Sequence, residues 1–159
     1  LASEVVPKDR VVPDLPPGRV SDWVGDVIAE YYDAPHAIRD RDGNIPIRYG
    51  SAMVLIRIIE DGEYSWVHFF SPLVSNCFDG PKLLETLNEI NQTLVNRKVV
   101  LEGGALVVLT MDIPRAMLSK QSILAALDMM EVADELDTKI HELYGGDMMF
   151  SDLDKAYDV

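Results

Sequence analysis

Several segments of this sequence are apolar on both faces of a potential β-strand, and this limits the folds available to the chain. Side chains alternate between the two faces of a strand. Over residues 52–59, this places Ala52, Val54, Ile56 and Ile58 on one face and Met53, Leu55, Arg57 and Ile59 on the other. Residues 64–71 and 105–111 are also apolar on both sides. An antiparallel sheet with one face in water should alternate apolar and polar residues, so both faces of this sheet need cover.

Helical patterns separate these strand segments. Apolar residues recur at helical spacing from Ser21 to Pro35, from Asp79 to Leu94 and from Ser119 to Gly145. The first helix is followed by two short segments, His36–Arg39 and Ile45–Tyr49, that are typical of a hairpin. We therefore predict an α+β domain with three principal helices and a mainly antiparallel sheet of about five or six strands.

The chain divides into three parts by composition. Residues 1–19 contain four prolines, which disfavour helix, and are expected to form an arm or linker poorly tied to the core. Residues 20–146 form the predicted α+β domain, and residues 147–159 form an acidic tail. The chain begins at Leu1 without an initiator methionine or a signal-peptide pattern, so a processed chain and a fragment are both open.

Charge and cysteine content exclude several functions. The 159 residues include 14 Lys and Arg against 27 Asp and Glu, giving a net charge of −13. Such a chain repels nucleic acid and anionic lipid, and no apolar run reaches the roughly 18 residues needed to span a membrane. Cys77 is the only cysteine, so no intrachain disulfide can form, which suits the cytoplasm.

Catalytic and cofactor motifs are incomplete. His141-Glu142 begins like a zinc-protease helix, but Gly145 stands where the second histidine belongs. Gly103-Gly104 lacks the residues of a phosphate-binding loop. We expect no catalytic residues, no cofactor and no metal. A small enzyme using Cys77 with His36, His68 or His141 stays open as the least favoured alternative.

The two-sided strands predict a partner-binding surface. Trp66 and Phe70 share one strand face, and His68 between them is costly to bury unpaired, so this face is expected to be the less enclosed one. The predicted binding residues are Met53, Leu55, Trp66, His68 and Phe70. The candidates for covering this face are a second subunit, a peptide or the chain's own arm. Helices that cover both faces within one monomer are the alternative.

Local sequence motifs resemble those of bacterial YbjN-like domains and the related type III secretion chaperones over residues 20–146. The similar segments are residues 42–48 before Gly50-Ser51-Ala52, Leu87-Asn88 with Asn91, and Ala133-Asp134 followed by residues 143–146. The resemblance implies a small, often dimeric scaffold without catalytic groups that binds peptides or proteins. We therefore expect a cytoplasmic, non-enzymatic chaperone-like homodimer that buries an apolar client segment on its sheet or between subunits. A structural homodimer without a client is the alternative.

Overall fold

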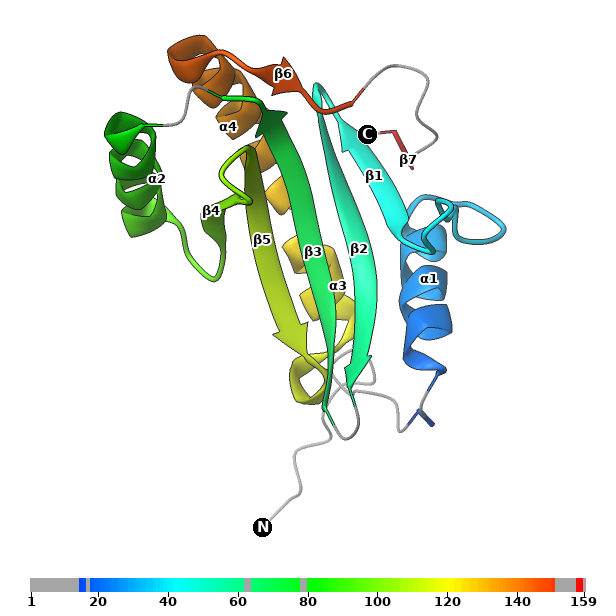
Figure 1. Ribbon diagram of the computed structural model, residues 1–159. Helices are drawn as coiled ribbons and strands as arrows, with labels where there is room; N and C mark the ends of the chain where they lie inside the picture. The colour runs from blue at the N-terminus through cyan, green and yellow to red at the C-terminus, as the bar shows by residue number, and fades with distance from the viewer. Residues whose placement is uncertain (1–14, 17, 62–63, 78–79, 151–156, 159) are drawn as a thin grey trace.

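A seven-stranded sheet forms the centre of the computed structural model, which describes residues 15–16, 18–61, 64–77, 80–150 and 157–158. The strands follow the spatial order β4-β5-β3-β2-β1-β7, and β6 pairs with β3 (Figure 1). Every pair is antiparallel except β1 with β7. The strands are β1 (Ile45–Tyr49), β2 (Ala52–Asp61), β3 (Tyr64–Ser75), β4 (Lys98–Glu102), β5 (Leu106–Pro114), β6 (Asp147–Met148) and β7 (Tyr157–Asp158).

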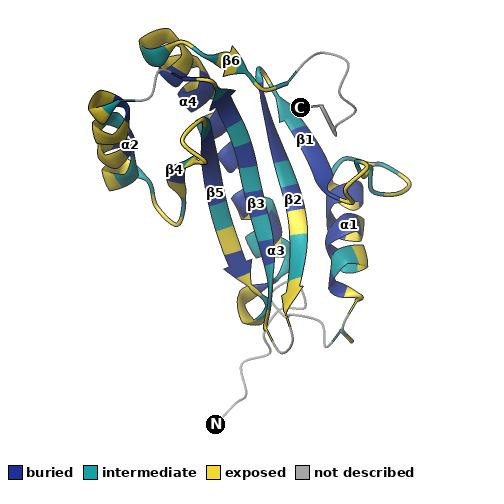
Figure 2. Cartoon of the chain, in the orientation of Figure 1, coloured by how far each residue is buried: buried dark blue, intermediate teal, exposed yellow. Residues whose placement is uncertain are grey.

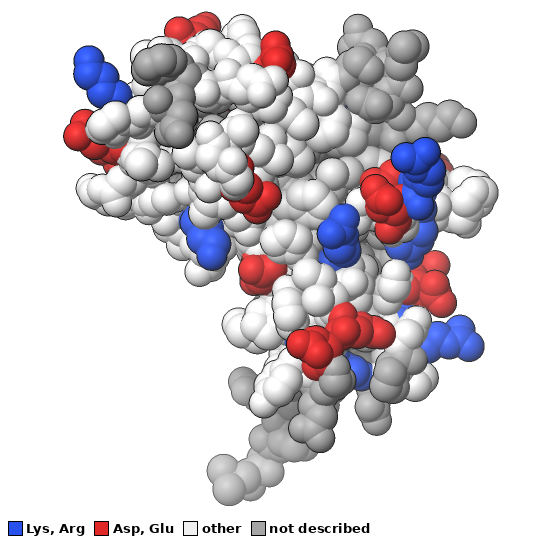
Figure 3. All heavy atoms as spheres, in the orientation of Figure 1, with Lys and Arg blue, Asp and Glu red and all other residues white. Residues whose placement is uncertain are grey.

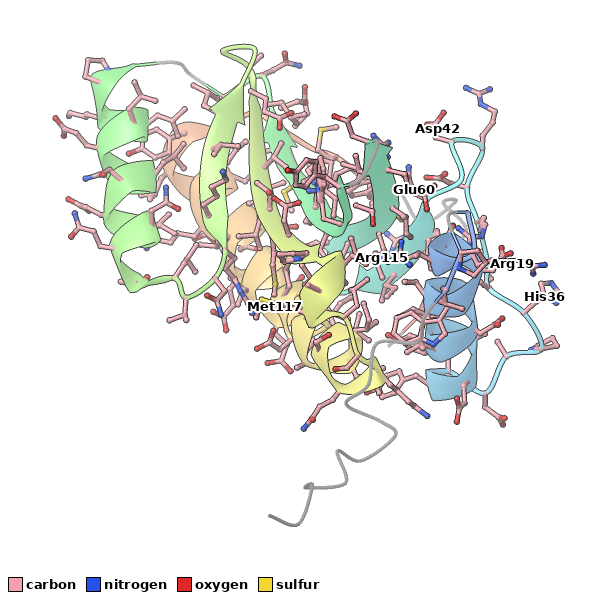
Figure 4. The ribbon with its side chains drawn as sticks, turned by 90° about the horizontal axis from the view of Figure 1, so that it is seen from below. Arg19, His36, Asp42, Glu60, Arg115 and Met117 are labelled. Carbon is pink, nitrogen blue, oxygen red and sulfur yellow. The ribbon has the colours of Figure 1, made fainter. Side chains whose placement is uncertain are left out.

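Helices cover one face of this sheet. The helices are α1 (Val20–Tyr31), α2 (Pro81–Thr93), the 3-10 turn η2 (Arg115–Met117), α3 (Lys120–Ala126) and α4 (Met129–Tyr144). Figures 1 and 4 show α1, α3 and α4 on the same side of the sheet, whereas α2 flanks β4. Among the described helices, none has the length and apolarity to cross a membrane.

The core lies between the sheet and these helices. Val54 and Ile56 of β2, Val67 and Phe69 of β3 and Leu109 of β5 are all buried there (Figure 2). They meet the apolar stripes of α1 and α4, whose recurrence at helical spacing made both helices predictable. The predicted α+β class and the mainly antiparallel sheet are confirmed.

The last predicted helix is divided into α3 and α4. Ser119 caps the start of α3, and its side chain accepts a hydrogen bond from the backbone N–H of Ser122. At the junction, the N–H of Leu127 donates to the carbonyl of Leu124, and that of Met130 donates to the carbonyl of Leu127. These bonds span three residues rather than four, so a tighter turn interrupts the α-helical hydrogen bonding between α3 and α4.

The predicted hairpin after the first helix is wrong in its first strand. Residues 36–39 form no strand, and only Ile45–Tyr49 joins the sheet. The side chain of Asp40 accepts hydrogen bonds from the backbone N–H groups of Asp42 and Asn44, which closes a local turn. Arg39 binds the carbonyls of Ser21 and Gly43. These side-chain bonds hold the segment against the start of α1 instead of in the sheet.

Both predicted terminal segments make contacts where they are described. Leu15 packs against the core, its carbonyl accepts a hydrogen bond from Arg115, and the N–H of Gly18 donates to Glu60. Residues 1–14 and 17 of the predicted arm lie outside the described residues. In the predicted acidic tail, β6 extends the sheet beside β3 and β7 lies beside β1.

Candidate functional site

No described helix crosses the sheet face that lies opposite α1, α3 and α4 (Figures 1 and 4). Strand register determines which side chains share this face, because directly paired residues point to the same side. The pairs between β2 and β3 are Leu55 with Phe70, Arg57 with His68 and Ile59 with Trp66. His68 and Phe70 pair with Asp112 and Thr110 of β5. We call this surface the open sheet face and define it by Leu55, Arg57, Ile59, Trp66, His68, Phe70 and Asp112.

Phe70 occupies the middle of a stacked group. The ring centre of His68 lies 5.0 Å from that of Phe70, with the two planes 20° apart. The guanidinium carbon of Arg57 lies 5.1 Å from the centre of the Phe70 ring. A cation at this distance is attracted to the negative face of an aromatic ring. The group therefore combines a partly exposed ring with a positive charge fixed beside it.

Hydrogen bonds hold the two polar members of this group in place. His68 Nδ1 donates to Asp112 Oδ1 over 2.6 Å. Arg57 Nε donates to Asn44 Oδ1 over 2.7 Å, and the amide of Asn44 donates to Asp40. Because these side chains are already oriented, a ligand would lose less free energy in ordering them. The face is thus a prepared surface, with its polar groups satisfied and its rings partly exposed.

The open sheet face contains a shallow hollow of about 200 Å³. Space-filling spheres in Figure 3 show that most of the visible surface is neither acidic nor basic, and that acidic and basic side chains are scattered over the remainder. A hollow that combines apolar lining residues with fixed polar groups suits a side chain of an extended ligand. The hollow is lined by Arg57, His68, Phe70, Pro72, Glu102, Leu106 and Val108.

Four of the five predicted binding residues are partly exposed on the open sheet face. Leu55, Trp66, His68 and Phe70 are neither fully buried nor fully exposed. Met53 pairs with Arg48 and belongs to the same face by register, but it is only 3% exposed. It can support a ligand-binding surface from beneath, and it offers almost no area for direct contact.

Sequence reasoning missed Arg57 and Asp112 as members of this surface. Arg57 had a signal, since it is the one charged residue in the apolar segment 52–59. Asp112 had none, because its contact with His68 depends on the register of β3 with β5, two strands separated by α2 and β4.

Cys77 has the environment of a structural thiol. It is buried, and its Sγ lies 3.8 Å from the carbonyl oxygen of Gly145. Burial raises the pKa of the Cys77 thiol, which disfavours the thiolate needed for nucleophilic attack. Among the described residues, no group of three or more His, Cys, Asp or Glu side chains is placed to hold a metal ion.

The sequence motifs behind the family resemblance meet one another in the structure. Ser51 follows the β1–β2 turn, and its backbone N–H and hydroxyl both donate to Asp134 Oδ1 of α4, over 2.8 and 2.9 Å. The Ser51 hydroxyl also lies 3.0 Å from both carboxylate oxygens of Asp137. Asn91 of α2 binds both backbone groups of Val99 at the outer edge of β4. These motif residues therefore join elements of the scaffold.

Asp137 is the most deeply buried of the charged residues in this contact, with 1% exposure. Removal from water raises the pKa of its carboxyl, and the nearby Asp134 adds to this rise. Hydrogen bonds from Ser51 and Thr138 oppose the rise only in part. The contact is an anchor between the sheet and α4, and burial there favours the protonated form of Asp137 more than water does.

Three helices thus form a layer on one face of the sheet, and the opposite face is partly apolar. The family model described as T3SS (YopN, CesT) and YbjN peptide-binding chaperone 1 matches residues 19–152. The chain belongs to this family. No curated protein matches it.

A solved structure supports the fold. The chain is similar to one in the crystal structure of the ExsC–ExsE complex, with a TM-score of 0.59 and 15% sequence identity. The similarity covers 77% of this chain and 93% of that one. At this identity the likeness concerns the fold.

Proposed function

We propose that the protein is a non-enzymatic chaperone that holds an apolar segment of a client protein on the open sheet face. The observation that carries this proposal is the group formed by Phe70, His68 and Arg57 beside the hollow. Membership of a peptide-binding family supports the same function. The proposed contact residues are Leu55, Trp66, His68 and Phe70, with Met53 as support and Arg57 added to the set.

Binding on this face would draw its free energy from two sources. Apolar area removed from water contributes roughly 25 cal/mol per Å², before the cost of ordering the client. The net charge of −13 favours clients with basic residues around the apolar segment and raises their rate of encounter. A client with apolar anchors and basic flanks therefore fits this surface best.

Peptide binding to matched variants tests the proposal. Overlapping peptides from the source proteome are screened for binding, and the best binders are measured by calorimetry. Trp66→Ala should weaken their binding by about 30-fold, the loss expected for an aromatic hot spot. Tyr31→Ala removes an exposed aromatic ring from α1, outside the open sheet face, and serves as the control. Equal affinities for both variants and the unaltered protein would rule out this face as the client site.

We also propose a cytoplasmic homodimer. Leu84 on α2 and Val95 just after it are large apolar residues with 53% and 74% exposure, which supports a subunit contact near that helix. The single, unpaired Cys77 is compatible with a reducing compartment. Sedimentation at tens of micromolar, roughly the range that detects micromolar association, should show a dimer. A monomer throughout that range would contradict the homodimer.

A further inference from the structure

The edge of β5 is only partly covered by its neighbour β4. Strand β4 pairs with β5 from Leu106 to Thr110, and β5 continues through Met111, Asp112, Ile113 and Pro114. No described strand lies beside these last four residues on the β4 side. An uncovered strand edge presents backbone groups that can pair with another chain.

Alternation along the ladder identifies which backbone groups face this edge. Asn91 binds the N–H and carbonyl of Val99, so these two groups point away from β5. Val99 is paired with Leu109, and backbone groups alternate in direction along an antiparallel strand. Val108 and Thr110 therefore bond toward β4, and Asp112 points its N–H and carbonyl at the uncovered edge. Pro114 agrees with this assignment, because its missing N–H falls on the same outer side.

A groove lies beside this edge on the helix-covered side of the sheet. It has a volume of about 500 Å³ and is formed by the end of β5, η2, α3 and the segment before β4. Met111 and Ile113 pair with Phe69 and Val67, so their side chains point to this side. Met117, which is 70% exposed, lies on the α2 side of β5, whereas Arg115 and Glu60 lie toward α1 (Figure 4).

Charged groups mark the rim of the groove. Asp112 points to the opposite side of the sheet with His68, and its side chain is 46% exposed. Arg97 binds Asp128 through Nη2 over 2.8 Å, while its Nε–H is buried without an acceptor among the described residues. The rim thus has two exposed carboxylates, Asp112 and Asp128, of which Asp128 is paired with Arg97, and one unsatisfied donor, the Nε–H of Arg97.

We propose that an extended client segment adds to the uncovered edge of β5 as a short antiparallel strand, with the side-chain pattern apolar–basic–apolar. A residue opposite Asp112 would point to the side of the Asp112 carboxylate, where a basic side chain is favoured. Its two neighbours would face Met111 and Ile113 and place apolar side chains in the groove. This inference rests on the proposed peptide-binding function and adds a second contact region, a binding mode and a residue pattern.

Labelled synthetic peptides test the strand addition directly. The probe is a short fluorescein-labelled peptide with Val-Lys-Val at its centre and threonines on both sides. One control peptide has glutamate in place of the lysine, and another carries a methyl group on the central backbone nitrogen. We expect about 10-fold weaker binding for each control, because one loses the charge pair and the other loses a backbone hydrogen bond.

Protein variants separate the backbone contact from the charge. Asp112→Lys should reverse the preference, so that the glutamate peptide binds about 10-fold more tightly than the lysine peptide. Asp112→Pro and Asp112→Asn both remove the carboxylate, but only the first removes the N–H at the edge. We expect Asp112→Pro to bind about 10-fold more weakly than Asp112→Asn. Ala125→Trp, on the exposed side of α3 that lines the groove, should also block binding and keeps the test valid if the proline variant does not fold.

The outcomes distinguish this inference from the proposed function. A lysine peptide whose binding is unchanged by N-methylation and by Ala125→Trp, but is lost in Trp66→Ala, overturns strand addition and leaves the open sheet face as the client site. No binding of the lysine peptide by the unaltered protein also overturns the inference, while the proteome-derived peptides test the function separately. Dissociation of a homodimer by Ala125→Trp would identify a second copy of the chain as the occupant and would likewise overturn it.

Discussion

Phe69 and Phe70 are neighbours on β3, yet they occupy two different environments. Phe69 faces α1, α3 and α4 and has no exposed surface, whereas Phe70 lies partly exposed on the open sheet face between His68 and Arg57. The two residues have the same side chain, the same strand and adjacent backbone positions. Their difference shows that an apolar sequence pattern indicates which side chains avoid water. The pattern does not identify the helix, strand or partner that buries them.

The polar residues on the two faces of the sheet also differ in their contacts. On the covered side, Ser51, Asp134 and Asp137 are joined to one another between the β1–β2 turn and α4. On the open side, Arg57 and Asp112 are exposed residues that position an aromatic group. Polar contacts on the covered side attach one element to another, while those on the open side orient a surface.

Alanine substitutions at the two phenylalanines give the sharpest comparison. Phe69→Ala should lower the free energy of unfolding by about 3–5 kcal/mol, because it leaves a cavity in the core. Phe70→Ala should lower it by about 1 kcal/mol, because the ring is partly exposed and its main loss is the contact with Arg57. Urea unfolding of both variants measures the difference.

For client binding we expect the opposite order of effects, with the larger loss at Phe70 and the smaller one at Phe69. Phe70→Ala should weaken peptide binding, while any folded Phe69→Ala protein should retain it at a temperature well below its unfolding midpoint. Similar losses of stability in the two variants would mean that the open sheet face is enclosed in solution, and the contrast between the faces would have to be abandoned.

Much of the scaffold could be predicted from local patterns. The spacing of apolar residues identified α1, α2 and β2. Burial of one helix stripe or one strand face requires apolar residues at regular intervals in the sequence. The division between α3 and α4 could not be seen in this spacing, because the apolar stripe continues across Leu127 and Asp128. The failed strand at residues 36–39 shows the opposite error, in which side-chain bonds from Arg39 and Asp40 override a weak strand pattern.

The candidate surface could be predicted only in part. Alternation placed Trp66, His68 and Phe70 on one face of a strand, and the structure puts them there. Alternation could not show that Met53 is buried on that face, nor that Asp112 reaches His68. Both depend on strand register and on which elements cover each strand, and these are properties of the whole fold.

The turn between β1 and β2 tests how strongly the covered side holds the sheet. Gly50 has a φ of 56°, and a side chain there would meet the Asp134 carboxylate. Gly50→Ala should lower the free energy of unfolding by about 2–3 kcal/mol, through backbone strain and displacement of Asp134. Urea unfolding measures this loss.

Gly43→Ala is the matched control for this substitution. Gly43 also has a positive φ, of 83°, but a side chain there would meet no atom within 4 Å. It should therefore lose only about 1 kcal/mol, the strain cost alone. Equal losses at the two glycines would show that the contact between the turn and α4 contributes little.

The smallest expected effect is a change in pH dependence at Asp137. The folded state raises the pKa of this carboxyl above its ordinary value of 3.8, so the folded protein binds a proton more tightly than the unfolded chain does. By linkage, the contribution of Asp137 to stability is greatest at low pH, falls as the pH rises above 3.8 and becomes constant above the folded pKa. Asp137→Asn cannot ionise and should lack this fall. Urea unfolding from about pH 4 to about pH 7 should therefore show the stability of the unaltered protein declining relative to that of the variant.

Glu142→Gln makes the same change of carboxylate to amide at an exposed position of α4 and controls for the loss of one negative charge. Its stability relative to the unaltered protein should not show the dependence expected for Asp137→Asn, because the effect at Asp137 arises from burial. The open sheet face sharpens the comparison further, since peptide binding measured at each pH should be the same for Asp137→Asn and the unaltered protein wherever both are folded. A pH-dependent difference in peptide affinity between these two proteins would instead show that ionisation of Asp137 on α4 affects the client surface across the sheet. The two faces could then no longer be treated as separate.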